Sequence, residues 1–227
     1  ETVIPGGNTS GLELKLEGVA IVEFSDPAPE SAGLRRGDLV QKIDGVPVSS
    51  VADIVSRVER SAGRVLRLTV RRDGKEKTFQ IAARQDGGVW RLGILVRDGI
   101  TGIGTVTYYN PSDGTFGALG HGVSGFTDAR LLQIASGSLI GASVADVRRG
   151  AAGAPGELHG TFDPGKTLGS VTANTRCGLF GTAAELPQRT ALPVAAQEQV
   201  HTGAATILAN VQGEAVEEFS IRIEKLY

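Results

Sequence analysis

The chain has 227 residues, of which 41% are hydrophobic, and this is enough to form one or two globular domains that each bury a core. Its 32 glycines favour short strands and turns over helix bundles. A formal net charge of −2 argues against nucleic-acid binding, which needs a strongly basic face, and no apolar run is long enough to cross a membrane.

The N-terminal residues lack the features of a secretion signal. Glu1-Thr-Val-Ile-Pro-Gly6 contains neither a basic region nor an apolar stretch. Because the sequence contains no methionine, the natural start codon is expected to lie upstream or to have been removed. We therefore interpret the chain as a processed or trimmed product from which a signal or anchor is absent.

Short strands are predicted in the first 45 residues. Residues 12–16 alternate between apolar and polar side chains and residues 19–24 form an apolar run, so two strands are expected to meet at Gly18. A third strand is predicted over residues 38–43, and it ends at the turn Asp44-Gly45.

A helix and a hairpin complete this first region. The helix is predicted to begin after Ser50, whose hydroxyl can cap it, and to end near Gly63. Its apolar residues fall on one face, and they are Val51, Ile54, Val55 and Val58. Asp73-Gly74, between the apolar runs 65–70 and 78–81, is a strong hairpin signal. Residues 1–85 are thus predicted to form a small, partly open β-barrel with one or two helices.

One block of this region resembles a known domain. Ser31-Ala-Gly-Leu-Arg-Arg-Gly-Asp-Leu-Val-Gln-Lys-Ile-Asp-Gly-Val-Pro-Val48 is similar to the pattern S-A-G-L-x-x-G-D-x-I-x-x-I-D/N-G-x-x-V of bacterial PDZ domains. The resemblance implies that a peptide adds as a strand to a sheet edge and that its C-terminal carboxylate meets backbone N–H groups in a loop. It places that loop at residues 10–14 and the groove beside the predicted helix. The implied peptide-binding residues are Gly11, Leu12, Glu13, Leu14, Val51, Ile54 and Val55. A PDZ fold that only clamps its own neighbour remains an alternative.

The rest of the chain is predicted to be a β-domain. Residues 86–89 are polar and glycine-rich, so we place a linker there between a domain over residues 1–85 and a domain over residues 90–227. Strand-like composition recurs after it, first over residues 90–96, 102–109 and 115–119, and later in short runs between turn signals. Repeated short strands predict a barrel or a sandwich.

His121, one of three histidines, follows the strand at 115–119 in the glycine-rich segment Phe116-Gly-Ala-Leu-Gly-His-Gly-Val-Ser-Gly125. Histidine can accept and return a proton near neutral pH, and glycines let the backbone hold such a residue at a functional surface. His121 is therefore a candidate catalytic base. A structural histidine in a tight turn is the alternative.

Several other motifs are given less weight. Gly160-Thr-Phe-Asp-Pro-Gly-Lys-Thr167 matches the letters of a phosphate-binding loop, but a predicted strand follows it where that loop needs a helix. Gly99-Ile-Thr-Gly-Ile-Gly104 lacks a third glycine and a helix. The glycine-flanked serines nearest His121 are in none of the known nucleophile turns, and they are Ser124, Ser136 and Ser138. We interpret each as a loop serine.

No metal site is predicted. His121, His159 and His201 are far apart in the sequence, and the single cysteine, Cys177, excludes an intrachain disulfide and makes a cysteine-built site improbable.

The second region also resembles a known family. Gly102-Ile-Gly-Thr-Val-Thr-Tyr-Tyr-Asn-Pro111, followed by Phe116-Gly-Ala-Leu-Gly-His-Gly122, is similar to the signature of the stage IV sporulation protein B peptidases. Further similarity lies in residues 149–157, 168–174 and 178–181 and in Val3-Ile-Pro-Gly-Gly7. The resemblance implies a mainly β protein, with a PDZ domain followed by a chymotrypsin-like double β-barrel. It implies a secreted serine endopeptidase in which His121 is the general base, with no cofactor.

The resemblance further implies a biological role in endospore-forming bacteria. The enzyme would be secreted across the forespore membrane and would cleave a membrane-anchored regulator between forespore and mother cell, which activates a late mother-cell sigma factor pathway. Its PDZ domain would hold the enzyme inactive, bind the tail of a regulator, or engage its own chain to promote self-cleavage.

The chain departs from the family at its C-terminal end. In that family the catalytic acid and the serine, which lies in a Gly-Met-Ser-Gly-Ser turn, come after the strand that corresponds to residues 219–224, and the sequence ends at Tyr227. We therefore expect an incomplete peptidase domain, with the first barrel and the start of the second, and no proteolytic activity in residues 1–227 alone. A peptide-binding scaffold with a degenerate β-domain is the alternative. A quality-control protease is disfavoured because its PDZ domains usually follow the protease domain.

Overall fold

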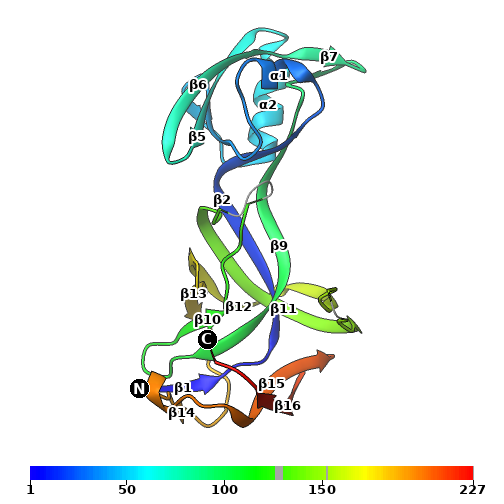
Figure 1. Ribbon diagram of the computed structural model, residues 1–227. Coiled ribbons are helices and arrows are strands. Elements are labelled where there is room, and N and C mark those ends of the chain that lie inside the picture. The colour runs from blue at the N-terminus through cyan, green and yellow to red at the C-terminus, as the bar shows by residue number, and fades with distance from the viewer. Residues whose placement is uncertain (126–129, 152, 227) are drawn as a thin grey trace. The chain divides into compact units, whose positions relative to one another are not determined.

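The computed structural model describes residues 1–125, 130–151 and 153–226, and they form a mainly β protein (Figure 1). The chain divides into two compact units. The barrel unit comprises Glu1–Leu14, Thr101–Val123 and Ser136–Tyr227, and the α2 unit comprises Lys15–Ile100 and Ser124–Ala135. In the described residues, no helix is both long and apolar enough to cross a membrane.

The α2 unit combines a small antiparallel sheet with two short helices. Its complete elements are α1 (Pro27–Ser31), β3 (Leu39–Ile43), β4 (Val46–Pro47), α2 (Val51–Ser61), β5 (Val65–Arg72), β6 (Lys75–Ala82), β7 (Arg84–Asp86) and β8 (Val89–Arg91). It also contains the second part of β2 (Thr9–Phe24) and the first part of β9 (Ile94–Tyr109). The sheet order is β2-β3-β5-β6, and β4 pairs with β3. Apolar side chains from these strands and from α2 form one core, which includes Val19, Ile21, Val40, Ile54 and Leu68.

Helix α2 begins and ends where its sequence predicts. The Ser50 hydroxyl accepts the Asp53 N–H at 3.1 Å, and the Asp53 carboxylate accepts the Ser50 N–H at 3.0 Å, so the two residues form a capping box. The N–H of Ser49 and the groups of Ser50 hold the pKa of Asp53 below its ordinary value. Ala62 ends the helix in a left-handed conformation, with φ of 49°.

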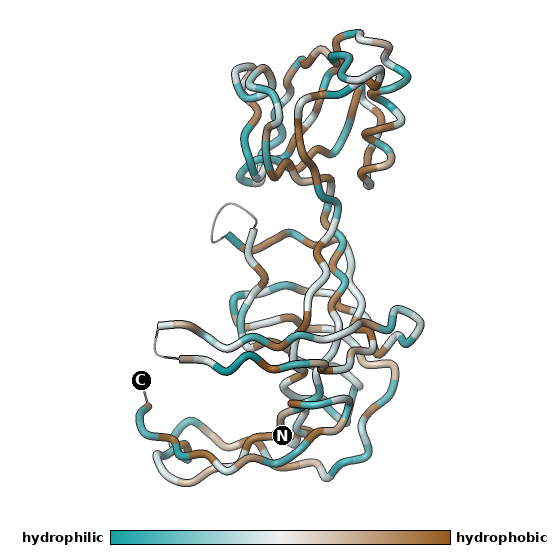
Figure 2. The backbone as a smooth tube through the Cα atoms, turned by 90° about the vertical axis from the view of Figure 1, so that its right-hand side faces the viewer, coloured by the Kyte–Doolittle hydropathy of each residue, from teal (hydrophilic) through white to brown (hydrophobic). Residues whose placement is uncertain are grey.

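The predicted hairpin is also present. Arg72 pairs with Lys75 across Asp73 and Gly74, whose φ angles are 53° and 74°. Positive φ at both turn residues matches the right-handed twist of the two strands. Strand β5 buries every second side chain over most of its length. Hydrophobic and hydrophilic stretches follow one another along the backbone of the chain (Figure 2).

One prediction for this region is corrected. The expected pair of strands around Gly18 is the single strand β2, because Gly18 adopts a φ of 144° and continues the strand close to the Val40 carbonyl, where a Cβ atom would come within 2.8 Å of its oxygen. Residues 86–89, predicted to be a linker between domains, lie in the hairpin β7–β8, and Trp90 packs against the core just after its tip. Their role as a linker stays a prediction.

The compact units also divide the chain differently from the predicted boundaries at residues 85 and 90. The N–H of Ser25 donates to the Gly93 carbonyl at 3.0 Å, and the N–H of Val106 donates to the Asn8 carbonyl at 3.1 Å. Strands β2 and β9 are therefore antiparallel partners. Each strand is divided between the two units, with one part in each. The boundaries themselves stay a prediction.

In the barrel unit, six strands form a closed ring. The complete elements are β1 (Thr2–Pro5), β10 (Thr115–Ala118), β12 (Glu157–Thr175), β13 (Gly178–Ala183), β14 (Leu192–Pro193), η1 (Gln197–Gln199), β15 (Gly203–Gln212) and β16 (Ala215–Ile223), and most of β11 (Ile134–Arg148) is included. Pairing runs from β9 through β10, β13, β12, β11 and β2 back to β9. Closure leaves no free edge in this ring and encloses Val106, Phe116, Leu139, Ile140 and Leu179, all nearly inaccessible to solvent. The sheet β15–β16 is separate from the ring.

Candidate active site

The hairpin β9–β10 leads directly to His121. In its turn, the Asp113 carboxylate accepts the Thr115 N–H at 2.9 Å and the Thr115 hydroxyl at 2.7 Å, and these hydrogen bonds hold the pKa of Asp113 below its ordinary value. Strand β10 then pairs on both sides, since Phe116 lies opposite Tyr109 on β9 and opposite Gly181 on β13. The strand that precedes His121 is therefore held from two directions.

The backbone turns sharply between β10 and His121. Leu119 has a φ of 71° and Gly120 a φ of 72°, so two successive residues are left-handed. This conformation is costly for leucine, and the N–H of Leu119 holds it by donating to the Thr105 carbonyl at 3.0 Å. The sequence predicted a special backbone at the glycines but not at Leu119. Residues in such strained backbone conformations are concentrated at functional sites, and this supports a functional role for the turn.

Two residues contact the turn, Asn174 near the end of β12 and Gly178 at the start of β13. At Gly178 a Cβ atom would come within 2.5 Å of the Ala118 carbonyl oxygen and 3.3 Å of the Gly120 nitrogen, so only glycine fits this approach. Asn174 binds the other side of the turn with both ends of its amide. Its Oδ1 accepts the Val123 N–H at 2.9 Å, and its Nδ2 donates to the Val123 carbonyl at 2.8 Å. Asn174 is a positioning residue that sequence reasoning did not single out, although it ends the family-like segment 168–174.

We expect Asn174→Ala to loosen this turn. Two hydrogen bonds to partly buried backbone groups are lost, at a cost of about 1–3 kcal/mol for each group left unsatisfied. Hydrogen exchange at the Val123 amide should accelerate, while exchange in α2 should not change. Asn174→Asp keeps the acceptor for the Val123 N–H and should show a smaller acceleration. Equal exchange in all three proteins would contradict the positioning role.

His121 itself is exposed, and its Nδ1 lies 3.1 Å from the Gly122 carbonyl oxygen. A carbonyl only accepts, so this hydrogen bond requires the proton on Nδ1. In the neutral ring the Nε2 lone pair is then available to accept a proton, as a general base needs. For His121, the hydrogen bonds described within residues 1–125, 130–151 and 153–226 include no serine or carboxylate partner.

The other histidines and the three candidate serines lie in other elements of the chain. His159 lies in β12 and His201 follows η1. Ser124 pairs with Leu131 in the α2 unit, and Ser136 and Ser138 lie in β11. In the described part of the chain, no group of three or more His, Cys, Asp or Glu residues is placed to hold a metal ion.

The predicted PDZ residues lie in two different units. Gly11, Leu12, Glu13 and Leu14 belong to strand β2 in the barrel unit, so the expected loop at residues 10–14 is corrected to a strand. The alternation of buried Leu12 and Leu14 with exposed Glu13 fits a barrel wall, and Gly11 lies against Ile140 and Phe162. Val51, Ile54 and Val55 belong to α2. Ligand binding by either group stays a prediction.

Helix α2 has β9 as a neighbour. The N–H of Val51 donates to the Asp98 carboxylate at 2.9 Å, and Ile94 and Val96 pack on the same core as buried Ile54. The Val55 side chain is 53% exposed. The other pairings of β9 involve only residues 106–109, so in the described chain Ile94–Ile100 have β2 as their strand partner.

A short pattern could have pointed to this part of β9. Gly93 stands between two apolar residues, Leu92 and Ile94, with a φ of 72°, and a strand begins immediately after it. Such a turn can present successive backbone N–H groups to a carboxylate.

The phosphate-loop match lies in a different structural context. Residues 160–167 are inside strand β12, and Lys166 pairs with Glu214 at 3.2 Å. A phosphate-binding loop would instead lead into the N-terminus of a helix.

Comparison with known proteins agrees with this organisation. Residues 9–83 match the PDZ domain family, and residues 88–227 match the family described as SpoIVB peptidase S55. A protein of Lactococcus lactis that is named as a zinc metalloprotease is 30% identical over 85 residues, which are 37% of this chain and 20% of that protein. The PDZ domain of an SdrC-like protein from Listeria monocytogenes is 21% identical, covers 37% of this chain and 90% of that domain, and has a TM-score of 0.33.

The peptidase match extends over more than half of the chain, and the PDZ match lies in front of it. The match begins in the hairpin β7–β8 and includes His121 and Asn174. The chain therefore belongs to the SpoIVB peptidase S55 family, and it carries a PDZ domain before its peptidase domain.

Proposed function

We propose that His121 is the general base of a serine endopeptidase. The observation that carries this proposal is the strained turn at Leu119 and Gly120, which presents an exposed imidazole whose Nδ1 is engaged by the Gly122 carbonyl. Nε2 would take the proton of a serine hydroxyl as its oxygen attacks a peptide carbonyl. It would then return this proton to the leaving amine.

The serine and the acid of this mechanism are proposed to come from residues outside 1–227. Two observations support this. The family resemblance puts both after the segment 219–224, and the three glycine-flanked serines nearest His121 in the sequence lie in a β-bridge or in strand β11. No cofactor enters the proposed chemistry, because the proton transfers need only protein groups.

The proposed role is signalling during endospore formation. Membership of the SpoIVB peptidase family supports a substrate that is a membrane-associated regulator, cleaved between forespore and mother cell to activate a late mother-cell sigma factor pathway. The enzyme would reach this space by secretion across the forespore membrane. Cleavage of its own chain would be part of its activation.

A fluorophosphonate probe, which reacts with activated serines, tests the peptidase proposal. The full gene product should be labelled, and residues 1–227 alone should not. Labelling of residues 1–227 would contradict the location of the serine. If the full product is not labelled but still binds peptides, the scaffold alternative is favoured.

We further propose that the α2 unit, which contains most of the PDZ match, binds a peptide along the edge of Ile94–Asp98, beside α2. Main-chain groups of a strand edge give affinity, and neighbouring pockets give specificity. Exposed Val55, one helical turn after partly buried Val51, supplies an apolar surface toward such a peptide. This position replaces the strand at residues 10–14 as the ligand-binding edge.

Val55→Glu should weaken binding of C-terminal peptides about tenfold or more, because it puts a carboxylate on the apolar surface that a ligand side chain would contact. The matched control is Val65→Glu, which changes a valine on β5 that is similarly exposed, at 58%. Peptide arrays followed by titration give the affinities. Equal weakening by both variants would contradict the proposed groove.

A further inference from the structure

The α2 unit contains a cavity whose lining is rich in arginine. It has a volume of about 200 Å³ and lies between the loop at residues 35–39, the β5–β6 turn and residues 130–133. Five arginines line it, and they are Arg35, Arg36, Arg71, Arg72 and Arg130. The volume is below the roughly 300–1,000 Å³ of sites for drug-sized ligands, so it suits one or two side chains of a partner and not a cofactor.

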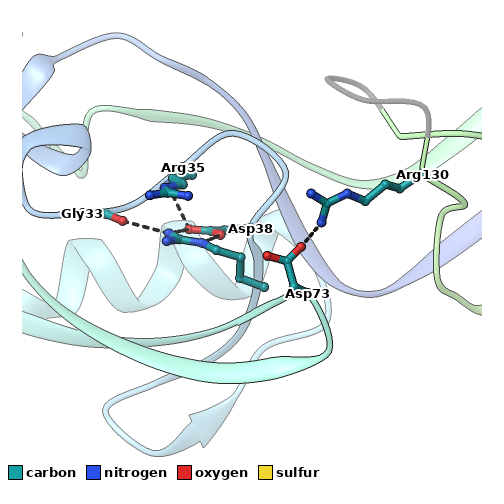
Figure 3. A network of polar contacts seen from close by, with 6 residues as sticks. Gly33, Arg35, Asp38, Asp73 and Arg130 are labelled. Carbon is teal, nitrogen blue, oxygen red and sulfur yellow. Dashed lines mark hydrogen bonds and ion pairs between the residues drawn. The ribbon is translucent and has the colours of Figure 1, made fainter.

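One of these arginines is fully engaged inside the unit. Arg72 Nε and Nη2 each lie 2.6 Å from an oxygen of Asp38, and Nη2 also donates to the Gly33 carbonyl at 2.8 Å (Figure 3). Asp38 is 1% exposed and also accepts the Arg35 N–H at 2.9 Å. The hydrogen bonds to Asp38 raise the pKa of Arg72 above its ordinary value. Arg72 and Asp38 thus line the cavity as a largely buried ion pair.

Two of the other arginines have acidic partners. Asp73 pairs with Arg130 (Figure 3), and Glu17 pairs with Arg71 through Nη2. The Nε of Arg71 is buried without a hydrogen-bond partner among the described residues. The side chains of Arg35 and Arg36 are exposed, and the ion pairs described for this chain include neither of them.

Arg35 and Arg36 therefore bring two positive charges to the cavity that none of the ion pairs described for this chain balances. The fold does not require these two charges. Positions 35 and 36 are the two unspecified positions in the pattern S-A-G-L-x-x-G-D, and both are arginine in this chain.

We propose that this cavity binds an acidic peptide segment of a protein partner. A carboxylate side chain would meet the guanidinium groups of Arg35, Arg36 and Arg71, which can bind it with paired, charge-assisted hydrogen bonds. Leu39 and Leu131, which also line the cavity, would contact an apolar neighbour of that acid. Apolar lining favours a peptide over a free phosphate as the occupant.

Binding here would also reach the segment after His121. Three contacts hold the described residues 125 and 130–133 within the α2 unit: the Asp73–Arg130 pair, the Gly125 N–H to the Arg130 carbonyl at 2.8 Å, and the Glu17 N–H to the Gln133 carbonyl at 3.2 Å. Residues 130–133 form one wall of the cavity, so an occupant should slow hydrogen exchange there.

Titration with a short peptide tests this site. The probe is a hexapeptide of alternating leucine and glutamate, acetylated at its N-terminus and amidated at its C-terminus so that it offers no terminal carboxylate to the PDZ groove. The control peptide carries glutamine in place of glutamate. Residues 1–227 should bind the acidic probe and not the control, and exchange at residues 131–133 should slow.

The double variant R35Q/R36Q should bind the acidic probe about tenfold more weakly, as expected for the net loss of one charge-assisted hydrogen bond. Both side chains are exposed, so the variant should fold normally. The matched control R67Q/K77Q removes the same charge from exposed positions on β5 and β6 outside the cavity and should bind like the parent.

Three outcomes would overturn the proposal. They are no binding at millimolar probe, equal weakening by both double variants, and occupation of the cavity by inorganic phosphate but not by the peptide. Binding needs no catalytic serine, so this result is independent of the outcome of fluorophosphonate labelling.

Discussion

Replacement of His121 by alanine is expected to lower the kcat/KM of the full gene product for a peptide substrate by roughly 10⁴-fold or more. The reason is that a serine hydroxyl is a weak nucleophile until a base removes its proton, and loss of a triad histidine removes nearly all of the covalent chemistry. KM should change little, because His121 is proposed to act on the reacting atoms and not in substrate binding. Initial rates over a range of substrate concentrations separate the two parameters.

His201 provides the matched control for this experiment. It is also exposed, and its Nδ1 lies 2.9 Å from a backbone carbonyl, that of Gln199. His201→Ala should keep the parental rate. If H121A retained its activity, or if both variants lost activity to the same extent, His121 would not be the general base.

Asp38→Asn is expected to destabilise the α2 unit by about 3–5 kcal/mol. The change leaves the Arg72 guanidinium, whose side chain is 12% exposed, without its counter-ion, and an uncompensated buried charge is far more costly than the loss of a surface pair. The single tryptophan, Trp90, packs against the core of this unit, so its fluorescence during urea unfolding reports the loss directly.

An exposed pair in the same unit gives the comparison. Arg91 and Asp86 lie 3.4 Å apart with side chains 62% and 78% exposed, and Asp86→Asn should cost about 1 kcal/mol or less. The double variant D38N/R72M should be less destabilised than D38N alone, because no buried charge is then left unpaired. Equal midpoints for D38N and D86N would show that the Arg72–Asp38 pair contributes no more than a surface pair.

Local patterns predicted the elements that local interactions define. The start of α2 depends on Ser50 and Asp53, three residues apart, and the β5–β6 turn depends on Asp73 and Gly74 alone. Both were predicted correctly because their hydrogen bonds and φ angles arise within a few residues. The glycine-rich segment around His121 was singled out for the same reason.

The errors concern strands whose partners lie far away in the sequence. The PDZ resemblance placed a loop that binds a peptide end at residues 10–14, but these residues pair within the barrel ring against strands about 90 or more residues later, so they extend as one strand through Gly18. Residues 86–89 are polar and glycine-rich both as a linker and as a hairpin tip. Only the pairing of β7 with β8 shows that these residues form the tip of a hairpin.

Sequence by itself determined the family, the order of its two domains, helix α2, the Asp73-Gly74 hairpin and the candidate His121, since each depends on short patterns or on matched motifs. Tertiary structure alone decided that six strands close a barrel, that Leu119 and Gly120 bend the chain before His121, and that Asn174 holds the turn at Val123, which lies 51 residues earlier. It also brought the five arginines to one cavity. The physical reason is that long-range strand pairing sets these distances, and no local pattern encodes which distant backbone groups will pair.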